Sequence, residues 1–239
     1  MGCWGGTLFD VPSLSAEETT TGRSRMLRHL ASAEEYLHNA GFSTEHLRTL
    51  LMVGTHAANG HAYLDRKGAV AWFAIECFHG KMDTKVFTMH ELIHALHYEA
   101  RPEFAFTTIK KKNLVWRQLI TEGIATYLTK HLLNITDEAA LWADAIRAKQ
   151  IQRWMAACRI AEKELFRLVG DTFESSDPSI ALFSAANPED IFSYRAGYYV
   201  GLTTIESIAS ENNFSVYDLL HLPSQDLKRL VWNHIQSRN

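Results

Sequence analysis

The chain of 239 residues contains only three cysteines, Cys3, Cys77 and Cys158, which lie far apart in the sequence. No two of them form a CxxC pair, so their spacing predicts neither a disulfide framework nor a zinc knuckle. Small proteins of oxidising compartments that depend on disulfides usually carry denser cysteine. We therefore expect a chain that works in the reducing cytoplasm.

Long apolar runs and strong net charge are also missing. No stretch approaches the roughly 20 apolar residues that a membrane-spanning helix needs, and residues 1–6 lack the basic region and hydrophobic core of a signal peptide. The net charge is −3, and Lys110–Lys112 is the only run of basic residues. We therefore expect neither a membrane nor a nucleic acid as a partner.

One pentapeptide stands out, His90-Glu91-Leu92-Ile93-His94, which has the H-E-x-x-H pattern. An α-helix turns about 100° per residue, so the two histidines lie about 40° apart around the axis and about 6 Å apart along it. That spacing lets both imidazoles bind one metal ion, typically Zn²⁺. Glu91 lies on the flank of the same face, where a carboxylate can take a proton from a metal-bound water.

The flanking residues predict a buried helix around this pentapeptide. Asp83 can N-cap a helix that begins near Thr84, and an apolar stripe at helical spacing follows, Val86, Met89, Ile93 and Leu96. The helix should end before Pro102. His97 shares the ligand face but lies about 10 Å along the axis from His90, too far to bind the same ion. We therefore expect His97 on the helix surface or as a residue that orients another ligand.

Catalytic zinc usually takes three protein ligands and keeps a fourth position for water, so a third ligand is needed. Glu122 is the best candidate, because it lies in the segment TEGIATYL at 121–128, on the next predicted helix. A carboxylate in such apolar surroundings is costly to bury unless it is paired or bound to a metal. Gly123 costs this helix about 1 kcal/mol relative to alanine, which indicates that two helices approach closely here.

With these motifs the chain resembles the gluzincin zinc peptidases, whose pattern is HExxH followed by a Glu on a second helix. More specifically, it is similar to a bacterial family of predicted zinc-dependent proteases. The matching segments are HELIHA at 90–95, TEGIATYL at 121–128 and SYRAGYYVG at 193–201, and the resemblance spans about residues 45–235. It implies an α+β fold of the zincin-like kind, with a small twisted sheet beside the HExxH helix and a mostly helical C-terminal half.

The third motif contains candidates for stabilising the oxyanion of amide hydrolysis. Tyr194, Arg195 and Tyr198 lie about one turn apart on a helix that we expect to begin with Asn187-Pro188. A Tyr hydroxyl or the Arg guanidinium aimed at the metal can stabilise such an oxyanion, and related gluzincins use a Tyr or a His in this role. The segment is also typical of helix packing, in which its glycines admit a neighbour and its rings fill the core.

The 46% hydrophobic content is enough for one domain, 1–239. Residues 1–112 should hold an N-terminal helix, the sheet and the HExxH helix, and 113–239 a helical lobe with the third ligand. Expected helices are 15–39, 44–50, 136–170, 189–211 and 223–236, and expected strands are 50–53, 61–65 and 69–77. By the resemblance, Val70–Ile75 should run along the cleft and pair with an extended peptide. Segment 171–187 should be a loop that covers the site or binds substrate.

Together these residues predict metal-assisted hydrolysis of a peptide or small-molecule amide. Zn²⁺ held by the two histidines and Glu122 would activate a water and polarise the scissile carbonyl. Glu91 would transfer the proton, and Tyr198 or Arg195 would hold the oxyanion. One alternative is a zincin-fold enzyme that acts on a non-peptide small molecule in a biosynthetic pathway. Another is a non-catalytic zinc-binding domain, against which Glu91 argues, because a structural site needs no base.

Overall fold

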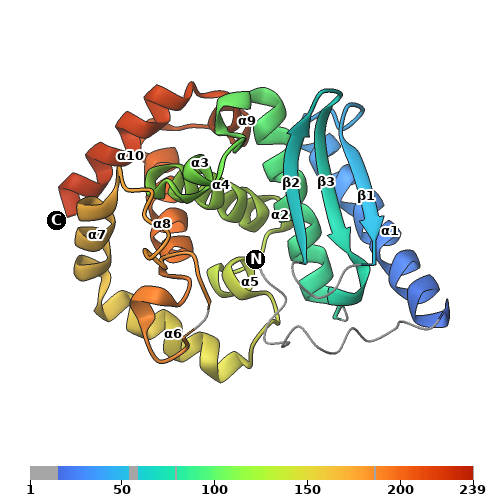
Figure 1. Cartoon of the computed structure of the whole chain (residues 1–239), viewed down its shortest axis with the longest axis horizontal. Coiled ribbons are helices and arrows are strands. Elements are labelled where there is room, and N and C mark those ends of the chain that lie inside the picture. The colour runs from blue at the N-terminus through green and yellow to red at the C-terminus, as the bar shows by residue number, and fades with distance from the viewer. Residues whose placement is uncertain (1–15, 54–58, 79, 186, 239) are drawn as a thin grey trace.

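The computed structural model describes residues 16–53, 59–78, 80–185 and 187–238 (Figure 1). A three-stranded mixed sheet lies at one side of the molecule, and helices make up most of the remainder. The expected α+β class, with a small sheet and a mostly helical C-terminal half, is therefore confirmed. None of the described helices combines the length and the apolar character needed to cross a membrane.

The sheet is formed by β1 (Arg48–Met52), β2 (Gly60–Asp65) and β3 (Gly68–Ala74), in the order β1-β3-β2. β1 runs parallel to β3, and β2 runs antiparallel to it. A tight turn joins β2 to β3, and Gly68 has a φ of 113°, which glycine adopts at little cost. The strands agree with those expected, except that β3 ends at Ala74 and a 3-10 helix (Ile75–Cys77) follows.

The central position of β3 corrects the expected cleft edge. Both of its edges are occupied, by β1 and β2, so Val70–Ile75 has no free edge for a peptide, and that expectation is wrong. β2 is instead the edge strand nearer to the helical half (Figure 1). The predicted helix 44–50 is also wrong, because pairing with β3 holds residues 48–52 extended.

Helices α1 (Ala16–Asn39) and α2 (Lys81–Ala100) cover the sheet. α2 packs on β2 and β3, and α1 packs along α2. The apolar stripe expected on α2 is buried, and it consists of Val86, Met89, Ile93 and Leu96. Buried apolar residues of α1 include Met26, Leu30 and Leu37. α1 ends where expected, and Gly41 follows it with a φ of 87°.

The C-terminal half is helical. Its elements are a 3-10 helix (Pro102–Phe104), α3 (Ile109–Asn113), α4 (Val115–Leu133), α5 (Asp137–Trp142), α6 (Ala148–Ile160), α7 (Glu162–Thr172), η3 (Ile191–Ser193), α8 (Ala196–Asn212), α9 (Val216–His221) and α10 (Ser224–Arg238). α4 packs against both α2 and α8, and so connects the two halves (Figure 1).

Two glycines set how closely α4 and α8 approach. A Cβ added to Gly123 would lie 2.7 Å from the carbonyl oxygen of Gly201, and one added to Gly201 would lie 3.0 Å from that of Leu119. The close approach predicted at Gly123 is confirmed, and the neighbour that it admits is α8. Because Glu122 directly precedes Gly123, this contact also sets how far the predicted third ligand lies from α8.

The predicted long helix 136–170 is wrong, because the chain forms α5, α6 and α7 instead. Thr136 does cap α5, its Oγ1 accepting the Ala139 N–H at 3.3 Å. Ala143 then adopts a φ of 51° and ends the helix. The break lets the rings of Trp142 and Trp154 meet with centroids 5.1 Å apart, whereas a continuous helix would separate the residues by about 18 Å. Both rings are buried in the core.

α8 begins at Ala196 and not at Asn187-Pro188, so that expected start is wrong. The preceding residue, Arg195, adopts a left-handed φ of 59°. Its N–H donates to the carbonyl oxygen of Ser184 at 2.6 Å, and the Gly197 N–H donates to that of Leu182 at 2.8 Å. The preceding loop therefore satisfies N–H groups that a helix start leaves without partners.

The cysteines also differ from expectation. Cys77 is disulfide-bonded, so the prediction from cysteine spacing does not hold for it. Cys158 is a buried free thiol whose pKa is raised by burial.

Candidate metal centre

The HExxH pattern lies on α2, whose first turn differs from expectation. The helix begins at Lys81 and its N-cap is Gly80, not Asp83. Asp83 lies in the first turn, where its Oδ2 accepts the Gly80 N–H at 3.2 Å. A carboxylate there stabilises the helix through its dipole and its free N–H groups. The helix ends at Ala100, before Pro102, as predicted.

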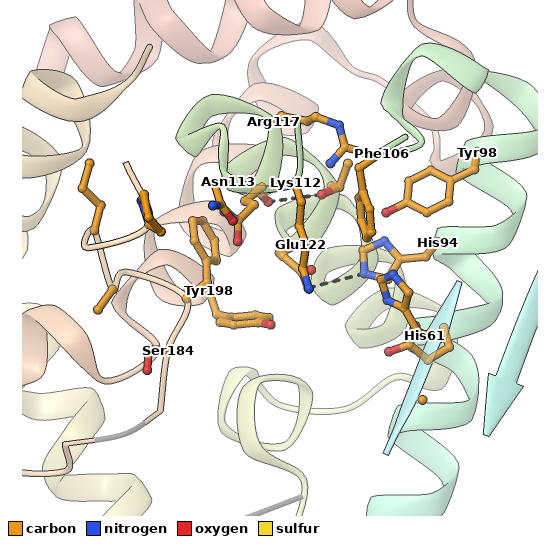
Figure 2. A pocket seen from close by; sticks show the side chains of 18 of the residues that line it. His61, His94, Tyr98, Phe106, Lys112, Asn113, Arg117, Glu122, Ser184 and Tyr198 are labelled. Atoms are coloured by element: carbon orange, nitrogen blue, oxygen red, sulfur yellow. Dashed lines mark hydrogen bonds and ion pairs between the residues drawn. The ribbon is translucent and has the colours of Figure 1, made fainter. Parts of the chain in front are cut away.

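α2 and α4 bring His90, His94 and Glu122 together, as predicted. Figure 2 shows His94 and Glu122 facing each other. The Nε2 atom of His90 lies 3.1 Å from His94 Nε2 and 3.1 Å from Glu122 Oε2, and His94 Nε2 lies 3.4 Å from Glu122 Oε2. Four ligands at about 2.05 Å around a tetrahedral ion stand about 3.3 Å apart. The three atoms therefore have the spacing of one face of a metal coordination sphere.

Charge and burial within this group favour a bound cation. Burial acts against the charge of Glu122, yet the neighbouring His94 and His90 hold the pKa of that carboxyl well below its usual value. Burial also acts against protonation of His94, yet Glu122 raises the pKa of this imidazole. The carboxylate therefore requires positive charge beside it, which a bound metal ion supplies.

Glu91 is buried, at 5% exposure, and is separate from the ligand group. Its Oε2 has no hydrogen-bonding partner in the described part of the chain. Glu91, His94 and Glu122 line a common cavity of about 500 Å³. A buried carboxylate oxygen without a partner is costly, and a water or substrate in this cavity would satisfy it.

The cavity lies between the sheet, the two ligand helices and the loop before α8 (Figure 2). Gly60 and His61 of β2 and Trp72 of β3 form one wall. Residues of the irregular segment after α7 form another wall, namely Asp177, Pro178, Ile180, Ala181, Phe183 and Ser184. The segment expected to cover the site or bind substrate, 171–187, thus contributes directly to the cavity.

Of the three oxyanion candidates, Tyr198 lines the cavity and the other two pack behind it. Burial and the nearby Glu122 raise the pKa of the Tyr198 hydroxyl well above its usual value, so it is a hydrogen-bond donor. Figure 2 shows Tyr198 reaching from α8 towards Glu122. The guanidinium of Arg195 lies 4.3 Å from the Tyr198 ring centroid and 4.7 Å from that of Trp142. The Tyr194 ring also packs on Trp142, at 5.2 Å.

His97 is outside the ligand group, as helix geometry predicts, but it is fully buried and the expected surface position is wrong. The 3-10 helix Pro102–Phe104 folds back over the end of α2, and the rings of His97 and Phe104 lie 4.5 Å apart. Burial lowers the pKa of His97 to about 3, so the ring is neutral.

His61, Tyr98 and Arg117 also line the cavity, and the sequence pattern did not single them out. The His61 ring packs 4.8 Å from Phe106, and burial lowers the pKa of this imidazole. The Tyr98 ring stacks 5.7 Å from that of His94. The four-residue spacing from His94 to Tyr98 was a usable signal. The charged Arg117 in an otherwise apolar segment was also a usable signal. No local sequence feature indicated that His61 would line the cavity.

Comparison with protein-family models, with curated proteins and with solved structures finds no match. The resemblance to gluzincin peptidases inferred from the three sequence motifs therefore stays a prediction.

Proposed function

We propose that this protein is a zinc-dependent hydrolase of the gluzincin type, which cleaves peptide or amide bonds with a metal-activated water. The observation that carries the proposal is the triangle of His90, His94 and Glu122, with Glu91 in the same cavity. A structural zinc site usually closes with a fourth protein ligand. In the part of the chain that the structure describes, the group has three ligands, which leaves a position for water or substrate.

Zn²⁺ bound by the two histidines and Glu122 would lower the pKa of a water and polarise the scissile carbonyl. Glu91 accepts the proton of the attacking water and delivers it to the leaving amine. Tyr198, which burial keeps protonated, donates a hydrogen bond to the oxyanion that forms on the substrate carbonyl. Arg195 stacks on the Tyr198 ring and holds its orientation.

The arrangement of sheet and helices supports a zincin-like fold. The sheet packs on α2, and the edge strand β2 contributes Gly60 and His61 to the cavity wall. An extended peptide beside β2 would place its backbone against this edge. The alternative, an enzyme acting on a non-peptide small molecule, uses the same ligands and differs only in what enters the cavity.

The variant Glu91→Gln tests the proposal. We expect the wild-type protein to bind zinc and to cleave members of a peptide library. Glu91→Gln should keep a full equivalent of zinc, because Glu91 is not a ligand, and should lose about 10²- to 10⁴-fold in rate, because the general base is gone. Elemental analysis measures the metal, and mass spectrometry of the digest measures turnover.

Glu99→Gln is the matched control, since it removes a carboxylate from the same helix. Glu99 is exposed and accepts the Ala69 N–H at 2.8 Å, away from the cavity, so zinc content and turnover should both persist. Full activity in Glu91→Gln would refute the assignment of the base. Zinc binding without cleavage of any library peptide would favour the small-molecule alternative.

A further inference from the structure

We infer that Arg117 determines the substrate specificity of this cavity by binding a carboxylate of the substrate. The inference rests on the proposed hydrolase function and names its substrate class. The substrates are peptides or acylated amino acids that carry a carboxylate close to the bond that is cleaved. That carboxylate is either the free C-terminus of the substrate or an acidic side chain.

Arg117 is a buried cation that forms no ion pair with an acidic side chain among the described residues. It is 2% exposed, and its Nε, Nη1 and Nη2 atoms have no hydrogen-bonding partner among the described residues. Burial lowers the pKa of the guanidinium, which Tyr98 and Glu122 partly oppose. An arginine nevertheless keeps its charge at neutral pH, because its ordinary pKa lies above about 12. A buried charge with unused donors is strongly unfavourable unless a ligand satisfies it.

Aromatic rings position the Arg117 guanidinium without using its hydrogen-bond donors. Its Cζ lies 4.8 Å from the centroid of Phe106 and 6.0 Å from that of Tyr98. Rings contact the flat face of a guanidinium, whereas its N–H groups point outward in the plane. Figure 2 shows Arg117, Phe106 and Tyr98 gathered on one side of Glu122. The stacking therefore leaves the donors available to a ligand in the cavity.

The same wall carries a second positive charge and no acidic residue. Lys112 lines the cavity, and its Nζ lies 5.9 Å from the Phe106 centroid. Asn113 and Gln118 add neutral amides on this side. The wall formed by α3 and the start of α4 is thus suited to an anion.

The acidic residues of the cavity have other roles. Among the residues that the structure describes, they are Glu91, Glu122 and Asp177. Glu122 belongs to the metal group, and Glu91 is assigned to the water. Asp177 is exposed, and its Oδ1 accepts the Ser179 N–H at 2.9 Å. The partner that Arg117 requires therefore has to come from the substrate.

A planar carboxylate matches the donors of a guanidinium, which can bind both of its oxygens at once. The distance to the metal centre also suits a small group. The Tyr98 ring packs near both sites, with its centroid 5.7 Å from the His94 ring and 6.0 Å from Arg117 Cζ. One or two residues of a substrate can therefore contact both the metal group and Arg117.

Calorimetric titration of zinc-loaded Glu91→Gln tests the inference without turnover. The ligands are two pairs of peptides of equal length. In the first pair, one peptide ends in a free carboxylate and the other in an amide. In the second pair, both ends are blocked, and one peptide carries an internal Glu where the other carries Gln. We expect one acidic peptide to bind about 10- to 100-fold more tightly than its neutral partner. Adding Arg117→Met should abolish that difference, and Arg117→Lys should retain part of it. Lys149→Met, on an exposed lysine outside the cavity, should leave it unchanged.

The inference is overturned if the two peptides of each pair bind equally tightly, or if none of the peptides binds. This comparison uses zinc-loaded Glu91→Gln alone and needs no variant at Arg117. A preference for the acid that persists in Arg117→Met also overturns it, because the metal or Lys112 would then hold the carboxylate. Failure of the wild-type protein to cleave any peptide would count against the proposed function, while the binding comparison would still be decisive. A melting temperature of Arg117→Met that is no lower than that of the wild type confirms that the variant is folded.

Discussion

At the scale of single residues, the buried polar side chains near the site differ in how the free-energy cost of burying them is avoided or offset. His97 has become neutral, because burial lowers its pKa to about 3. Glu122 stays charged beside His90 and His94, which hold its pKa low. Arg117 stays charged with no protein partner for its nitrogens among the described residues. These three outcomes agree with a packing role for His97, the proposed metal ligation by Glu122 and the proposed substrate contact of Arg117.

The neutral His97 predicts a loss of stability in mild acid. Its folded-state pKa of about 3 lies below the ordinary histidine value of about 6.5. Between these values the unfolded chain binds a proton that the folded chain does not. Stability therefore falls as the pH falls, by about 1.4 kcal/mol per unit. From pH 7 to pH 5, His97 should remove about 2 kcal/mol from the free energy of unfolding.

Urea denaturation at several pH values, with a chelator present, measures this dependence. His97→Phe keeps an aromatic ring against Phe104 and should show a slope lower by about 1.4 kcal/mol per pH unit. His46→Phe, at an exposed position, should keep the wild-type slope. Identical slopes for the wild type and His97→Phe would show that His97 is not a buried neutral histidine.

At the scale of secondary-structure elements, the contact of α4 with α8 sets the separation between the side chains that the two helices contribute to the site. α4 carries Glu122, and α8 carries Tyr198. The two helices approach at Gly123 and Gly201, where a Cβ on either would meet backbone atoms of the other helix at 3.0 Å or less. Backbone atoms cannot move aside as a flexible side chain can. The separation of the third ligand from Tyr198 therefore depends on these two glycines.

Gly123→Ala should push α4 away from α8, because the new Cβ would lie 2.7 Å from the Gly201 carbonyl oxygen. We expect the free energy of unfolding to fall by about 1–3 kcal/mol, the usual cost of overpacking. Zinc affinity should fall as well, since Glu122 is the adjacent residue. Denaturation and zinc titration measure the two effects. Ser210→Ala, exposed on α8, should change stability by less than about 0.5 kcal/mol; an equally small effect of Gly123→Ala would contradict the argument.

At the scale of the whole molecule, the candidate metal group of His90, His94 and Glu122 joins the two halves of the chain. His90 and His94 come from the half that contains the sheet, whereas Glu122 comes from the helical half. An ion held by all three binds the folded protein and not the unfolded chain. Metal binding should therefore stabilise the molecule as a whole.

Adding Zn²⁺ to chelator-treated protein should raise its melting temperature. At a free zinc concentration about 1,000 times the dissociation constant, the gain is about 4 kcal/mol, which corresponds to about 8–16 °C for a chain of this size. Differential scanning calorimetry measures the shift. Glu122→Ala should greatly reduce it, and Glu99→Gln should retain it. A melting temperature that does not respond to zinc in the wild type would rule out the three-residue site.

Part of this protein follows from the sequence alone, because the relevant physics is local. Residues four apart on a helix share a face, so the HExxH spacing predicts that His90 and His94 meet. A carboxylate in the apolar surroundings of Glu122 already required a partner. The apolar stripe from Val86 to Leu96, with Pro102 after it, also predicts α2.

The rest was decided by contacts between residues distant in sequence. The order of the sheet, which makes β2 and not β3 the edge strand, depends on pairing across the chain. The break after Trp142 depends on its contact with Trp154, and the burial of His97 depends on the segment that folds over it. The convergence of His61 and Arg117 on one cavity is likewise tertiary. Sequence spacing determines which side chains share an element, whereas only packing between elements determines which of them surround the metal group.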